Sequence, residues 1–99
     1  MPSGTGKIIR EIRDFIARHG EDYSNWYIGI TTDPISRLLD DHKVDINVDL
    51  WLCSEAFSND EARKVEERLI SESGVTGDCQ DGETGQFVYA YRMSDNTEP

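Results

Sequence analysis

Apolar side chains near the N-terminus recur every three or four positions, which is the period of an amphipathic helix. Ser3 or Thr5 is suitably placed to cap the start of this helix, and Gly20 suits its end. The pattern predicts a helix over about residues 5–19. Its predicted buried positions are Ile8, Ile9, Ile12, Phe15 and Ile16.

Three other segments have the alternation and the β-branched or aromatic content of strands. They are residues 26–31 (WYIGIT), 48–57 (VDLWLCSEAF) and 87–93 (FVYAYRM). Side chains two apart on a strand share a face, so Tyr89 and Tyr91 point the same way and either one could face Tyr27.

A second helix is predicted directly after the first strand. Thr32 or Asp33 provides an N-cap, and Pro34 stands at the first helical position, where its missing N–H costs nothing. The helix carries Arg37 and ends near His42. Its predicted buried face consists of Ile35, Leu38 and Leu39.

A third helix is predicted from Ser58 to about Ser73, because Ser58 and Glu61 form a capping-box pattern and Gly74 suits the end. Glu66 lies at the edge of its apolar stripe, where a carboxylate is costly unless it is paired or binds a cation. Two interpretations remain open: a structural partner for a boundary side chain, or a metal ligand. The stripe consists of Ala62, Val65, Leu69 and Ile70.

The order of these elements predicts an α+β fold with a small three-stranded sheet flanked by three helices. Ninety-nine residues fit a single domain over residues 1–99, with an acidic loop at 74–85 and a flexible tail at 94–99. Apolar runs are too short for a membrane span, and the N-terminus lacks the apolar core of a signal peptide. Cys53 and Cys79 form no framework or ligand motif, so we expect free thiols and a cytoplasmic protein.

Acidic residues outnumber basic ones by 20 to 10, giving a formal charge of −10. All of the excess lies beyond residue 22, since residues 1–22 carry four residues of each sign. Lys and Arg supply most nucleic-acid affinity by neutralising phosphates, so this balance disfavours tight autonomous binding to DNA. A small local basic site remains compatible with it.

Several pieces of the sequence resemble the GIY-YIG nuclease family. Tyr27-Ile28-Gly29 is similar to the second signature of that family, and ITTDP followed by Arg37-Leu38 is similar to its turn into the catalytic helix. Glu61-Ala62, then Glu66, then Leu69-Ile70 resembles the next helix, whose glutamate binds the metal. The strand of the first signature is not in its usual place before residue 26. Residues 87–92 (FVYAYR) resemble it, with Phe in place of Gly, which suggests a circular permutation.

The resemblance implies a GIY-YIG-like fold and a phosphodiester-cleaving site. In that site Glu66 would hold Mg²⁺ or Mn²⁺, and Arg37 would clamp the phosphate of a DNA or RNA substrate. Tyr27 and Tyr89 would orient or deprotonate the nucleophile, and His42 would act as general base or proton relay. His42 follows Arg37 by five positions, whereas the family usually has four. Affinity would come from a protein partner or a homodimer.

Structural roles are the alternative for each of these residues. Strand tyrosines are often half-buried aromatics, Arg37 can pair with Asp33, Asp40 or Asp41, and a histidine near a helix end interacts with the dipole. The sequence also lacks a match for the family's asparagine and most of its basic cluster. A non-catalytic acidic protein-interaction module on the same scaffold is therefore the second functional hypothesis. A third is that the acidity reflects solubility or adaptation to high salt.

Overall fold

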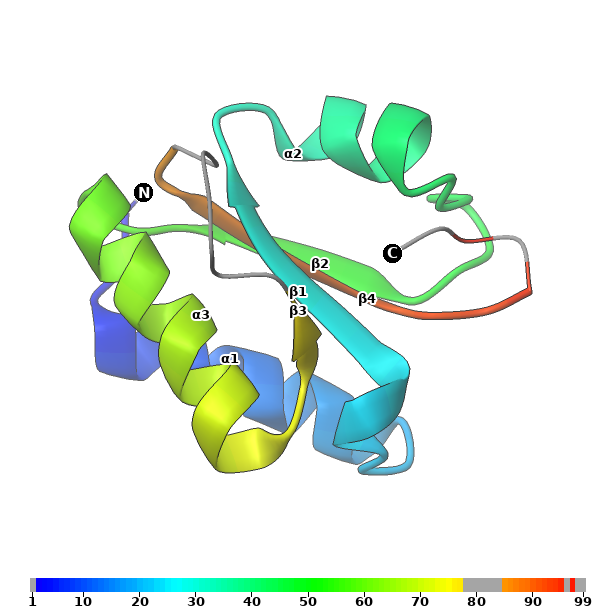
Figure 1. Cartoon of the computed structure of the whole chain (residues 1–99), viewed down its shortest axis with the longest axis horizontal. Helices are drawn as coiled ribbons and strands as arrows, with labels where there is room; N and C mark the ends of the chain where they lie inside the picture. The colour runs from blue at the N-terminus through cyan, green and yellow to red at the C-terminus, as the bar shows by residue number, and fades with distance from the viewer. Residues whose placement is uncertain (1, 78–84, 96, 98–99) are drawn as a thin grey trace.

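One four-stranded sheet with helices on both faces forms the protein (Figure 1). The computed structural model describes residues 2–77, 85–95 and 97. The helical elements are α1 (Thr5–Arg18), the 3₁₀ turn η1 (Tyr23–Asn25), α2 (Pro34–Ser36), the π-helix η2 (Arg37–Asp41) and α3 (Asn59–Ser73). The strands are β1 (Trp26–Thr31), β2 (Trp51–Glu55), β3 (Thr76–Gly77) and β4 (Phe87–Arg92).

The last strand of the chain lies in the interior of the sheet. The strand order is β2-β4-β1-β3, and β4 runs antiparallel to both β1 and β2. Gly29 of β1 and Cys53 of β2 stand opposite Tyr89 of β4 on its two sides. The sequence at the C-terminus therefore lies directly beside the YIG segment.

The α+β class is confirmed, but the prediction of three strands is wrong because β3 adds a fourth. It pairs in parallel with β1, with Thr76 opposite Tyr27. A two-residue strand within a turn-rich segment has no period to detect. The rest of the predicted acidic loop, residues 78–84, lies outside the described residues, as does Cys79. Of the predicted tail, residues 94, 95 and 97 are described, and Ser94 bonds to Thr97 across a short turn.

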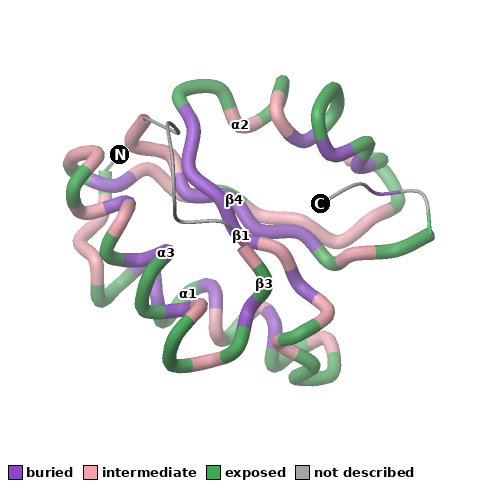
Figure 2. Tube along the Cα trace, viewed as in Figure 1, coloured by how far each residue is buried: buried purple, intermediate pink, exposed green. Residues whose placement is uncertain are grey.

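Helices α1 and α3 cover one face of the sheet, and α2 with η2 covers the other (Figure 1). The first face buries alternate residues of β1, among them Trp26, Ile28 and Ile30, against the isoleucines of α1. All four isoleucines of the predicted helix are buried, whereas Phe15 is only partly so. Figure 2 shows that the most continuously buried path runs along β1 and β4.

Helix boundaries follow the predicted caps at four of five positions, among them Gly20, which takes a φ of 108° directly after the C-cap of α1. The Asp33 carboxylate accepts from the Ser36 N–H at 3.2 Å, and the Ser58 hydroxyl accepts from the Glu61 N–H at 3.2 Å. Gly74 ends α3 in the left-handed conformation, with φ 77°. The prediction for the start of α1 is wrong, since Gly4 occupies the cap without a side-chain bond.

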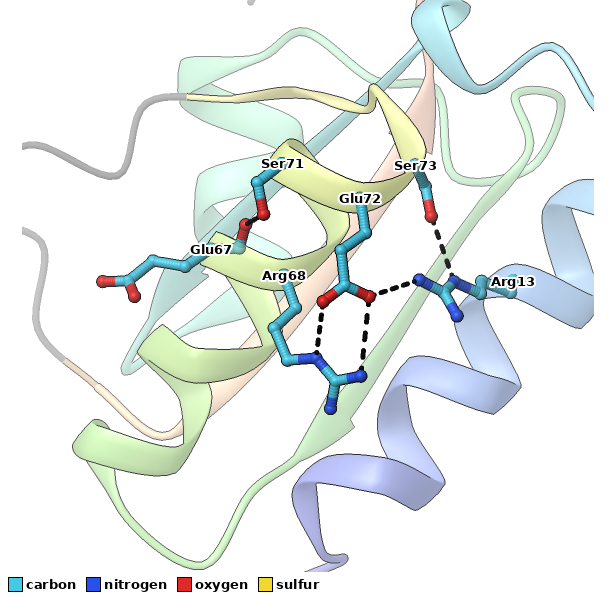
Figure 3. Close-up of polar contacts among 6 residues, drawn as sticks. All are labelled: Arg13, Glu67, Arg68, Ser71, Glu72 and Ser73. Carbon is cyan, nitrogen blue, oxygen red and sulfur yellow. Dashed lines mark hydrogen bonds and ion pairs between the residues drawn. The ribbon is translucent and has the colours of Figure 1, made fainter.

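A charge network ties α1 to α3 near their ends (Figure 3). Glu72 accepts from Arg68 at 3.2 Å on its own helix and from Arg13 of α1 at 3.1 Å. Arg13 also donates to the Ser73 hydroxyl at 3.0 Å. These two arginines lower the pKa of the Glu72 carboxyl, Arg68 more than Arg13.

None of the helices in the described part of the chain is long and apolar enough to cross a bilayer.

Candidate functional site

Three tyrosines and a histidine gather on the sheet face beneath η2. Tyr27 comes from β1, Tyr89 and Tyr91 come from β4, and His42 follows the last residue of η2. Leu38 and Val44 pack on the same face and complete a second hydrophobic cluster, separate from the core under α1 and α3. Strand alternation accounts for this separation, because odd-numbered residues of β1 and β4 face η2 and even-numbered ones face α1 and α3.

His42 is held by tyrosine hydroxyls at both ring nitrogens. Its Nε2 lies 2.6 Å from the Tyr89 hydroxyl oxygen, and its Nδ1 lies 3.0 Å from that of Tyr91. The Tyr27 ring lies alongside, with its centroid 4.9 Å from that of the imidazole. Tyr89 and Tyr91 are fully buried, and His42 is 4% exposed. Tyr27 is half-buried and so forms the rim of this tyrosine–histidine cluster.

The π-helix explains how His42 reaches the cluster from its position in the sequence. The His42 N–H donates to the Arg37 carbonyl at 3.0 Å, the five-residue bond that defines a π turn. A spacing of five therefore corresponds to one hydrogen-bonded turn here, as a spacing of four does in an α-helix. Lys43 then takes a left-handed conformation with φ 57°, and the Val44 N–H closes the end on the Leu38 carbonyl at 2.8 Å.

The wider turn also overturns the predicted buried face of this helix. Leu38 is buried, but Ile35 and Leu39 are 40% and 42% exposed. Because the segment contacts the sheet through Leu38 and His42, the side chains at 35 and 39 turn toward solvent. The α-helical period used in the prediction does not hold through residues 37–41.

Gly29 makes room for Tyr89. A Cβ atom added at Gly29 would lie 2.5 Å from the Tyr89 hydroxyl oxygen and 2.6 Å from its Cζ. The Tyr89 side chain thus occupies the space beside Gly29, its direct neighbour in the ladder. The glycine of the YIG segment is required by close approach, since φ is not in the left-handed region there.

The two contacts of His42 with Tyr89 and Tyr91 do not use every polar hydrogen of these three side chains. Neutral His42, Tyr89 and Tyr91 carry three polar hydrogens together, and the two contacts between them use two. If Nδ1 carries the proton, Tyr91 directs its own O–H elsewhere; if Nε2 carries it, Tyr89 does. Either tautomer therefore places one tyrosine hydroxyl proton outside these two contacts.

Tyr91 is held in its protonated form. Burial raises its pKa well above the usual value of a phenol, and the like charges that Tyr27 and Tyr89 would carry raise it further. The positive charge of Arg37 acts in the opposite direction and lowers the pKa, so its guanidinium lies within electrostatic range of Tyr91. At neutral pH Tyr91 is a hydrogen-bond donor and not a base.

Arg37 lies at the rim on η2, with its side chain 29% exposed. Its Nη1 lies 2.7 Å from an Asp41 carboxylate oxygen, an i,i+4 ion pair on the same helix. The structural alternative for Arg37 is therefore realised with Asp41. An incoming phosphate would have to compete with that carboxylate for the guanidinium.

Glu66 lies on α3, which packs through Ala62, Val65 and Leu69 into the core on the other face of the sheet. It is only 3% exposed, so its predicted place beside the apolar stripe is confirmed. Mg²⁺ keeps several waters and usually adds substrate oxygens to one or two carboxylates, so it needs an open site. One buried carboxylate does not fit that requirement. Within residues 2–77, 85–95 and 97, no three His, Cys, Asp or Glu side chains converge as a metal site.

Of the five predicted site residues, Tyr27, Tyr89 and His42 meet on one face of the sheet and Arg37 lies on η2, which covers that face. Glu66 lies on α3, which covers the other face. Tyr91 was not predicted to be a site residue, although its i,i+2 spacing from Tyr89 already placed both side chains on one face of the strand.

No family model matches this chain, and comparison with curated proteins and with solved structures finds no significant match.

Proposed function

We propose that the protein is a divergent, circularly permuted GIY-YIG-like nuclease that hydrolyses phosphodiester bonds of DNA or RNA. The observation that supports it best is the tyrosine–histidine cluster with Arg37 at its rim. Its members come from β1, η2 and β4, and His42 Nε2 lies 2.6 Å from the hydroxyl of Tyr89, 47 positions away. Pairing of β4 with β1, with Tyr89 opposite Gly29, is the arrangement that the proposed permutation requires.

In this proposal the substrate phosphate approaches the rim formed by Tyr27 and Arg37. Arg37 exchanges Asp41 for a non-bridging phosphate oxygen and stabilises the charge that grows there in the transition state. Water attacks phosphorus, the P–O bond to the leaving sugar oxygen breaks, and the water proton passes through a tyrosine hydroxyl to His42, while the leaving oxygen takes up a proton from solvent.

The resemblance also implies a divalent metal on Glu66, which would polarise the phosphate if bound. No step above depends on it, because the carboxylate is buried. We propose Mg²⁺ or Mn²⁺ as the ion to test.

A nicking assay on supercoiled DNA, repeated on single-stranded RNA, tests the proposal. Each ion is titrated, and Tyr27→Phe and Arg37→Ala are compared with the wild type. Arg68→Ala is the matched control, since it removes another i,i+4 arginine–acid pair, at 3.2 Å, from α3. Both site variants are expected to lose most activity while the control keeps it. Cleavage that neither site variant reduces would rule out this site.

The second candidate is a non-catalytic protein-interaction module. It is favoured by the burial of Tyr89, Tyr91 and His42, by the pairing of Arg37 with Asp41, and by the charge of −10. A folded protein that cleaves neither substrate with either ion would support this candidate over the nuclease.

A further inference from the structure

Strand β2 has an open outer edge. It is the terminal strand of the sheet, and β4 is its one ladder neighbour among the described residues. An unpaired edge offers backbone donors and acceptors to another strand, and proteins usually block such edges. Here the strand carries neither proline nor lysine in its five residues (WLCSE).

The ladder with β4 determines which groups point outward. The Leu50 carbonyl accepts from the Arg92 N–H, and the Ala56 N–H donates to the Gln86 carbonyl, so even-numbered residues face β4. Hydrogen-bonding direction alternates along a strand. The N–H and C=O groups of Trp51, Cys53 and Glu55 therefore point away from the sheet.

The N-terminal segment of the chain already uses one end of this edge. The Ser3 N–H donates to the Glu55 carbonyl at 2.7 Å, and Ser3 forms a parallel bridge with Ala56. This contact shows that the outward groups can bind a strand. It leaves the N–H and C=O of Trp51 and Cys53 and the N–H of Glu55 along the rest of the edge.

Two hollows follow the same edge, one of about 310 Å³ and one of about 270 Å³, and both include Glu11 of α1. Leu52 and Phe15 form an apolar wall of the second hollow. The charged side chains that line the two are Glu11, Asp14, Glu55 and Arg18, three acidic against one basic. Their balance matches the acidic balance of the whole chain.

We propose that the β2 edge binds an extended, basic peptide segment of a partner protein as an additional strand. Backbone hydrogen bonds to the outward groups of β2 would provide register, and alternate side chains would enter the hollow walled by Leu52 and Phe15. Lysine or arginine side chains would neutralise the acidic lining. The proposal is independent of any cleavage at the tyrosine–histidine cluster, which lies beneath η2 on the opposite face of the sheet from the hollow under α1.

The probe is a synthetic peptide of about six residues alternating Lys and Val, long enough to span a five-residue strand. Binding is measured by fluorescence anisotropy against a Glu/Val peptide of the same length. Two further probes carry N-methyl groups on one or the other alternate set of backbone nitrogens. Only one set can face β2, so one methylated peptide is expected to lose binding and the other to keep it.

Cys53→Pro tests the edge in the protein itself. It removes a donor that faces outward and leaves the ladder with β4 intact, so it is expected to weaken peptide binding about tenfold or more. Cys53→Ser keeps the N–H and is the control. Glu11→Lys is expected to weaken binding more than Asp40→Lys, which changes the net charge equally on η2.

Equal binding of the acidic peptide, or tolerance of both N-methylated peptides, would overturn the proposal. So would equal affinities of Cys53→Pro and Cys53→Ser, provided both unfold at similar temperatures. A wild-type dimer that Cys53→Pro dissociates would assign the edge to a second copy of the chain, and would also overturn it.

Discussion

Gly29→Ala should disrupt the packing of the tyrosine–histidine cluster without changing any of its side chains. The new methyl would lie 2.5–2.8 Å from three atoms of the Tyr89 ring, and that ring is fully buried. Tyr89 cannot move without breaking its 2.6 Å contact with His42. Overpacking costs about 1–3 kcal/mol, and a lost buried hydrogen bond costs about 1–3 kcal/mol.

The expected loss in the free energy of unfolding is therefore about 3 kcal/mol, or roughly 12–24 °C in melting temperature for a domain of this size. Urea denaturation followed by tryptophan fluorescence measures it. Gly6→Ala is the matched control, because a Cβ there meets nothing within 4 Å on an exposed turn of α1. It should stabilise the protein by about 0.5–1 kcal/mol.

A second variant connects the loss to Tyr89. In a double-mutant cycle with Tyr89→Leu, the two costs should be strongly non-additive, because the atoms that clash with the new methyl are absent. A loss below about 0.5 kcal/mol for Gly29→Ala, or additive costs in the cycle, would refute the close packing of Tyr89 on Gly29.

Three more predictions concern titration and charge. Because the pKa of Tyr91 is raised in the folded state, the stability that it contributes is complete below pH about 10 and is lost as pH rises further; Tyr91→Phe should flatten the fall of unfolding free energy in that range. The pKa of Glu72 is lowered, so Glu72→Gln should reduce the melting temperature slightly at neutral pH and low salt. That difference should vanish in about 1 M salt, and also as the pH falls below the usual carboxyl range and Glu72 protonates. Glu66→Gln keeps the side-chain shape and should change unfolding free energy by less than about 1 kcal/mol; a loss above about 3 kcal/mol would identify one half of a structural ion pair.

Helix caps and strand alternation could be read from the sequence because each depends on neighbours within a few residues. Asp33, Ser58 and Gly74 act where their local signals place them. The pairing of β4 with β1 could be inferred only through the resemblance, since pattern alone does not give strand order.

The structural features that the sequence did not predict depend on tertiary contacts. A π turn over Arg37–Asp41 has no sequence signature here, yet it exposes Ile35 and Leu39 and brings His42 over the tyrosines. The burial of Glu66 follows from how α3 packs. The sequence pattern placed Glu66 at the edge of the apolar stripe, but it did not predict that the side chain is almost completely buried.

The central claim is that Arg37 and the tyrosine–histidine cluster act together on a phosphodiester. The most direct test is the initial nicking rate of Arg37→Ala against the wild type and Arg68→Ala, at equal concentration and with melting temperatures checked. We predict a fall of about 100-fold or more for Arg37→Ala, the range for loss of one transition-state donor, and little change for Arg68→Ala. Equal rates for all three proteins would contradict the account.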